Sequence, residues 1–227
     1  MPSSVQRKRV RKSPAARRAE IVDAAAQVAL TEGLECITLR RIAEELDVRP
    51  GLISHYFPSA EDLVAEAFGR AAGRELDALL PDERPDGSPA HYLARFFALA
   101  TGPAYDDVSR LWINARHLSR YRPTLRERVE VQEAAWRTRF AAVIGDGVRD
   151  DEFRTDNPLL TAIHILVVLD GLGAHANTGT VDRPDAVARM AVTTAERELG
   201  LESGTLSAIA EGLSEADLAR PAEPQDA

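Results

Sequence analysis

Small and polar side chains gather between residues 38 and 57, where the pattern indicates a short exposed helix. They are mostly hydrogen-bond donors, acceptors and small groups, not the charged side chains of a solubilising face. Such a mixture suits the edges of nucleic-acid bases and the phosphates beside them. The residues of this helix and its start that we expect to contact DNA are Arg49, Pro50, Gly51, Leu52, Ser54, His55 and Tyr56.

Two short helices joined by a turn must position these side chains. Thr38 is a plausible N-cap for a first helix that runs to about Leu46. A turn follows, and Pro50 is tolerated in the first turn of a second helix that ends near Phe57. Such a helix-turn-helix unit places its second helix in the DNA major groove. The inward residues that would hold the two helices together are Ile42, Ala43, Val48 and Ile53.

The distribution of charge supports a nucleic-acid partner. The net charge is −8, yet the first 18 residues carry seven basic side chains and no acidic one. A basic end on an acidic body is typical of a segment that meets a polyanion, although a solvated tail has the same composition. We expect residues 1–15 to form a flexible basic arm.

Apolar spacings of three and four predict an all-α fold almost throughout the chain. We expect a three-helix DNA-binding head at residues 16–58 and a five- or six-helix body at 59–200. Residues 201–227 would be a tail, partly helical or disordered. The helices expected in the body are 59–80, 90–100, 106–121, 124–148, 158–177 and 184–199.

Two features of the body suggest binding sites. Aromatic and polar side chains at Trp112, Arg116, Trp136 and Phe140 suit a small-molecule cavity, although most such stripes are plain core. The most apolar helix, residues 158–177, places one stripe on a single face, which suits a partner helix or intrachain packing. The stripe consists of His164, Val168, Gly171 and His175.

The head resembles that of the TetR-type transcriptional repressors. The resemblance covers about residues 16–68 and is most like the BetI-type members at Ile53-Ser-His-Tyr-Phe57. It implies a homodimer that binds an inverted-repeat operator in double-stranded DNA and is released by a small-molecule effector. It assigns Thr38 and Tyr56 to phosphates and Arg40 to a base or the DNA backbone. It also suggests choline or a related cation as effector. By position, the helix 59–80 would relay effector binding to the head.

Three departures from the family pattern stand in the head. Leu46-Asp47 replaces the usual Ala-Gly before the turn, Arg49 replaces a small hydroxyl residue, and Ala60 replaces a common lysine. The first departure predicts a slightly different turn geometry. Arg49 and the basic arm would compensate for the missing lysine.

Other function classes find little support. No phosphate loop, Ser/His/Asp ordering or metal-ligand cluster is apparent, so we expect no enzyme, no catalytic or metal site and no cofactor. The single cysteine fits a reducing compartment, and the uncharged run 157–169 is short for a membrane span, so we expect a cytoplasmic protein. The alternative is a helical protein–protein adaptor without DNA binding, which leaves the basic arm unexplained.

Overall fold

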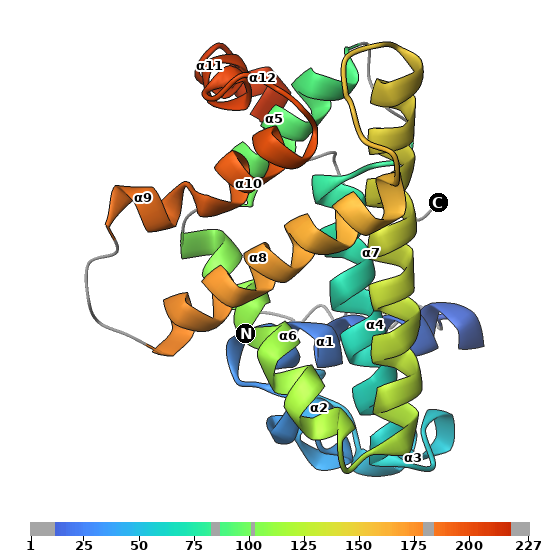
Figure 1. The fold of residues 1–227 in the computed structure, drawn as a ribbon. Helices are drawn as coiled ribbons and strands as arrows, with labels where there is room; N and C mark the ends of the chain where they lie inside the picture. The colour runs from blue at the N-terminus through green and yellow to red at the C-terminus, as the bar shows by residue number, and fades with distance from the viewer. Residues whose placement is uncertain (1–11, 83–86, 101–102, 179–183, 219–227) are drawn as a thin grey trace, which may run out of the picture.

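The structure is a computed structural model that describes residues 12–82, 87–100, 103–178 and 184–218. Within these residues every regular element is helical, which confirms the all-α prediction (Figure 1). Most of the expected basic arm lies outside the described residues.

The head consists of α1 (Pro14–Thr31), the 3₁₀ helix η1 (Leu34–Cys36), α2 (Leu39–Glu45) and α3 (Pro50–Tyr56). Helix α1 begins earlier than expected, because the Ser13 hydroxyl accepts a hydrogen bond from the Ala16 N–H and proline occupies the first turn. Gly33 ends the helix region with a φ of +102°, a conformation that favours glycine. Pro14 and Ala15, which we assigned to the arm, are therefore part of α1.

Five longer helices follow the head, and each is bounded by a local signal. They are α4 (Ala60–Leu79), α5 (Pro89–Leu99), α6 (Pro103–Ser119), α7 (Pro123–Arg149) and α8 (Pro158–Thr178). Four begin at a proline, which costs no hydrogen bond in the first turn. Ser59 caps α4 and Asn157 caps α8, because their side chains accept hydrogen bonds from the Glu61 N–H and the Leu160 N–H. Only the start of α6 differs noticeably from the expected position.

Helices α4 and α7 form the frame that joins head to body (Figure 1). Helix α4 packs along α1 at its head end, and α7 runs beside it toward the opposite end of the molecule. Helix α6 lies across α7 and α8 and also reaches α1 and η1. The body is therefore in direct contact with the head through α6 as well as through α4.

The C-terminal region departs from the sequence prediction. The prediction of a single helix over 184–199 is wrong. A turn at Arg189 divides this segment into α9 (Asp185–Ala188) and α10 (Met190–Glu198). The expected tail carries α11 (Thr205–Glu211) and α12 (Glu215–Leu218), and both pack on α5. Buried Glu196 accepts hydrogen bonds from the N–H groups of Gly204 and Leu206, which anchors α11.

Helix α8 is long and apolar enough to cross a membrane by length and composition alone. Over Pro158–Asn177 its mean hydropathy is 1.7. This span is longer than the uncharged run 157–169 considered in the sequence, because it includes the charged residue Asp170. One such helix is weak evidence for a membrane span. Here α8 packs against α6, α7 and α10, and Asp170 forms an ion pair with Arg116.

Candidate nucleic-acid interface and ligand pocket

The helix-turn-helix is held together by a small buried core. Ile42, Ala43 and Ile53 are almost completely buried, which confirms their expected inward position. Phe57 at the end of α3 is also buried, with 2% of its surface exposed. Small Ala43 lets α2 and α3 approach closely. Val48, also expected to face inward, is half-buried and packs against this core. The turn is closed by a hydrogen bond of 2.9 Å from the Val48 N–H to the Ala43 carbonyl.

The turn itself requires an unusual backbone conformation at Asp47. Its φ is +49°, in the left-handed region that Gly adopts freely and that Asp tolerates better than most residues. The Ala43–Val48 hydrogen bond and the left-handed residue before Val48 form a Schellman-type helix end. The departure at Leu46-Asp47 therefore keeps the turn at the cost of some backbone strain.

The residues expected to contact DNA lie on α3, the residue before it and the start of α2. Leu52 and Tyr56 are half-buried, and Tyr56 packs against the core. The Ser54 hydroxyl donates to the Pro50 carbonyl at 3.2 Å, so it presents an oxygen acceptor outward. The exposed members are Thr38, Arg40, Arg49, Pro50, Gly51, Ser54 and His55.

Two adjacent arginines in α2 have different environments. The Arg41 guanidinium binds Glu32 and Glu45, and these hydrogen bonds raise its pKa. Arg40 is 84% exposed at its side chain, and within the described residues its ion pair is with Glu44 at 2.9 Å. Arg40 is therefore the arginine of α2 that is available to DNA, as we expected from the family resemblance.

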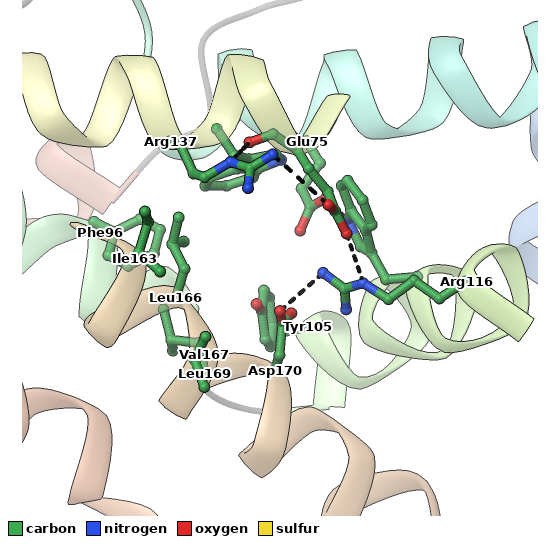
Figure 2. A pocket seen from close by; sticks show the side chains of 13 residues that line it. Glu75, Phe96, Tyr105, Arg116, Arg137, Ile163, Leu166, Val167, Leu169 and Asp170 are labelled. Atoms are coloured by element: carbon green, nitrogen blue, oxygen red, sulfur yellow. Dashed lines mark hydrogen bonds and ion pairs between the residues drawn. The ribbon is translucent and has the colours of Figure 1, made fainter. Parts of the chain in front are cut away.

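A cavity of about 200 Å³ lies in the body between α6, α7 and α8, with contributions from α4 and α5. Figure 2 shows Leu166, Val167 and Leu169 along one side and Arg137 and Arg116 at the other. Its volume is below the roughly 300–1,000 Å³ of pockets for drug-sized ligands, so a compact molecule would fit. The lining residues are Glu75, Phe96, Tyr105, Trp112, Arg116, Glu133, Trp136, Arg137, Ile163, Leu166, Val167, Leu169 and Asp170.

The cavity wall contains three carboxylates and two guanidiniums, so one negative charge is in excess. Arg116 pairs with Glu133 at 3.0 Å and with Asp170 at 2.8 Å, which links α6 to α7 and α8 (Figure 2). Burial alone would lower the pKa of Arg116, but Asp170 and Glu133 outweigh it and raise that pKa. Burial raises the pKa of Asp170 against the opposing effect of Arg116.

Aromatic rings provide much of the remaining wall. The Trp112 indole donates to the Glu75 carboxylate at 2.7 Å, which fixes that ring between α6 and α4. The Trp136 indole nitrogen is buried and has no hydrogen-bond partner in the described part of the chain. Burial is the main cause that raises the pKa of Tyr105, so its phenol stays protonated at neutral pH.

The structure brings three of the four predicted pocket residues together. Trp112, Arg116 and Trp136 line the cavity, whereas Phe140 does not and is completely buried. The assignment of Phe140 to the pocket is wrong because the Phe96 ring packs edge-on against it at 5.1 Å. Sequence reasoning missed Glu75 and Asp170, although a lone acid in the apolar helix 158–177 was a usable signal.

The stripe predicted for a partner helix lies on the surface of α8. His164, Gly171 and His175 are exposed and Val168 is half-buried. A Cβ added at Gly171 would meet no atom within 4 Å. Neighbouring apolar residues are also exposed, including Leu159, Leu160 and, at 62%, Val167.

Gly173, in the same helix, packs closely within the chain. A Cβ at this position would lie 2.8 Å from the Cβ of Ser109 on α6. The small residue therefore permits close packing of α6 on α8. No group of three or more His, Cys, Asp or Glu among the described residues is placed to hold a metal ion.

A helical head with an exposed recognition helix, joined to a helical body with a small cavity, defines a transcriptional regulator of the helix-turn-helix class. Residues 21–67 match the model of bacterial regulatory proteins of the tetR family. Residues 97–200 match the C-terminal domain of BetI-type transcriptional repressors. The chain belongs to the TetR family, whose members are DNA-binding regulators and not enzymes.

Individual relatives are similar over different parts of the chain. The transcriptional repressor KstR of Mycolicibacterium smegmatis is 41% identical over 62 residues, which are 27% of this chain and 30% of KstR. A regulator from Saccharomonospora viridis, solved with choline, has a TM-score of 0.66 and 22% identity, covering 78% of this chain and 94% of its own. The multidrug-binding protein EbrR, solved with proflavin, has a TM-score of 0.54 and 25% identity, covering 79% and 99%.

Proposed function

We propose that this protein is a homodimeric cytoplasmic repressor that binds an inverted-repeat operator and is released when a small organic cation occupies the body cavity. The observation that carries the proposal is the exposed face of α3 and the N-terminal part of α2 on a buried support. A helix of this kind fits the major groove, which is about 12 Å wide. The 41% identity to the repressor KstR over 62 residues supports repression.

The exposed apolar side chains of α8 support the dimer. Leu159, Leu160 and Val167 are large apolar side chains that a monomer would leave in water. A second copy related by a two-fold axis would cover the same surface of α8 on both protomers. Two recognition helices in such a dimer would read half-sites about one DNA turn apart.

The chemistry of the cavity supports a cationic effector. Its wall combines the Trp112, Trp136 and Tyr105 rings with an excess carboxylate charge, and cations bind over aromatic faces. The orphan indole N–H of Trp136 would be satisfied by an effector that also carries a hydrogen-bond acceptor. Two proteins of similar fold were solved with the cations choline and proflavin, which supports the same ligand class here.

The DNA-binding half of the proposal is tested by selecting random duplex DNA with the purified protein near physiological salt. An enriched inverted repeat with half-sites about one helical turn apart is expected. Refolding the protein beforehand removes any effector that co-purified with it. Failure to enrich any sequence with refolded, dimeric protein would overturn the proposal.

The effector half is tested with choline and its neutral isostere, in which a tert-butyl group replaces the trimethylammonium. A cation–π site should favour choline by about 1–2 kcal/mol, or roughly 5–30-fold in Kd. Calorimetry would measure both Kd values, and a Trp136→Leu variant should lose the preference. Equal affinity for the two compounds would exclude choline-type recognition.

A further inference from the structure

Asn114 on α6 joins the body to the head by two hydrogen bonds. Its Oδ1 accepts from the Leu34 N–H at 2.9 Å, and its Nδ2 donates to the Glu35 carboxylate at 2.6 Å. Both partners belong to η1, the short helix between α1 and α2. Asn114 thus binds a segment about 80 residues earlier in the chain, at the place where α6 lies beside α1 (Figure 1).

The segment that Asn114 holds determines where α2 begins. Leu34 is completely buried and Ile37 is 3% exposed, so both ends of η1 are anchored in the head core. Thr38 follows directly and caps α2 through its hydrogen bond from the Arg41 N–H at 3.0 Å. A displacement of η1 would therefore move the N-terminus of α2, where Thr38 and Arg40 face the DNA.

Helix α6 presents opposite faces to the cavity and to the head. Trp112 and Arg116 are four residues apart, about 40° on the helical wheel, and both line the cavity. Asn114 is two residues from each, about 200° away, which places it on the reverse side. Because a helix is stiff, a shift or rotation of α6 that accommodates a ligand displaces Asn114 as well.

Helix α4 is the other link between the two parts, but its position differs. It packs along α1 and is tied to it by the Arg18–Glu66 ion pair, so its N-terminal half belongs to the head. Helix α6 instead packs mainly on α7 and α8 and touches the head at α1 and η1. A movement of α6 relative to the head therefore changes the contact of Asn114 with η1.

We propose that Asn114 is the positioning residue through which occupancy of the cavity and occupancy of the DNA-binding face are coupled. The inference rests on the proposed function, because it assigns the route between its two sites. Thermodynamic linkage makes such coupling reciprocal, so operator binding must also alter the cavity. This reciprocity allows a test that does not require the natural effector.

The chain contains two tryptophans, Trp112 and Trp136, and both line the cavity. Their emission therefore reports on the cavity wall, including the contact of Trp112 with Glu75 on α4. A labelled operator duplex, obtained by the selection described above, is titrated with protein while anisotropy follows binding and tryptophan emission follows the cavity. The wild-type protein should show both signals with the same midpoint.

Asn114→Ala should still fold and bind the operator but lose most of the emission change. Asn114→Asp should behave in the same way, because its carboxylate would face Glu35. Adding Glu35→Gln to that variant restores a hydrogen bond of reversed direction and should restore the emission change. Glu66→Gln, which weakens the α4 link, is the matched control and should keep the wild-type response.

The outcomes separate the inference from the proposed function. No operator binding by wild-type protein would overturn both. If a folded Asn114→Ala variant binds the operator and shows the same emission change as wild type, the role of Asn114 is overturned and the proposed function is not. Loss of the response in Glu66→Gln, with retention in Asn114→Ala, would assign the coupling to α4. Rescue by the Asn114→Asp, Glu35→Gln pair would support the inference in a way that general destabilisation cannot mimic.

Discussion

Replacing Arg40 and Arg41 separately by alanine provides a sharp test of the DNA-binding face. The two residues are adjacent in α2, yet the Arg41 guanidinium is held by Glu32 and Glu45 while Arg40 is 84% exposed. Arg40→Ala should therefore remove a contact to DNA phosphate. Arg41→Ala should remove only contacts within the head.

The expected magnitude follows from counterion release. One lost phosphate contact lowers the slope of log affinity against log salt by about 0.9, and a dimer loses two, or about 1.8. Between roughly 50 and 200 mM salt, the affinity ratio of wild type to Arg40→Ala should then shrink by about 12-fold. The Arg40–Glu44 ion pair is largely exposed, so its loss should leave the fold intact.

Fluorescence anisotropy with the selected operator at four or more salt concentrations would measure both slopes. Circular dichroism and sedimentation would verify that each variant is folded and dimeric. Equal reductions of the slope in Arg40→Ala and Arg41→Ala would refute the orientation of α2 that we derive. An unchanged slope in Arg40→Ala would mean that Arg40 contacts no phosphate.

Three further predictions concern the frame, the turn and the cavity. A Cβ at Gly145 in α7 meets no atom within 4 Å, so Gly145→Ala should stabilise the protein by about 1 kcal/mol. Gly147→Ala places a Cβ 2.0 Å from the Phe153 ring and should destabilise the protein. Urea unfolding measures both variants, and a less stable Gly145→Ala than Gly147→Ala would contradict the packing. Asp47→Val should destabilise by about 1–2 kcal/mol, because a β-branched residue resists positive φ, while Asp47→Gly should not; equal effects would argue against the left-handed turn. Choline affinity should fall as acid protonates Asp170, starting at a higher pH than for an ordinary aspartate because its pKa is raised, and calorimetry of Asp170→Asn should show a flatter pH profile.

The helix-turn-helix could be predicted because its determinants are local. Thr38 caps one helix and Pro50 begins the next, so both boundaries depend on residues at or beside them. The inward positions follow from helical periodicity within one short segment. The orientation of Arg40 and Arg41 could not be derived this way, since it depends on Glu32 from the end of α1.

The cavity was predicted only in part because five helices build it. Periodicity placed Trp136 and Phe140 on one stripe of α7, but it does not specify how deep each lies. The Phe96 ring, from α5, covers Phe140 and leaves Trp136 at the wall. Likewise, the break between α9 and α10 falls at Arg189, where neither glycine nor proline marks it.

The acidic composition of the chain is compatible with DNA binding because of where the charge lies. Residues 1–57 carry ten basic and seven acidic side chains, a balance of +3, so the remainder carries −11 of the net charge of −8. Several head acids are also neutralised locally, as Glu44 is by Arg40 and Glu45 by Arg41. An acidic body repels the phosphate backbone while the head and the basic N-terminal segment attract it. The asymmetry therefore favours approach by the head and disfavours non-specific contact by the rest of the molecule.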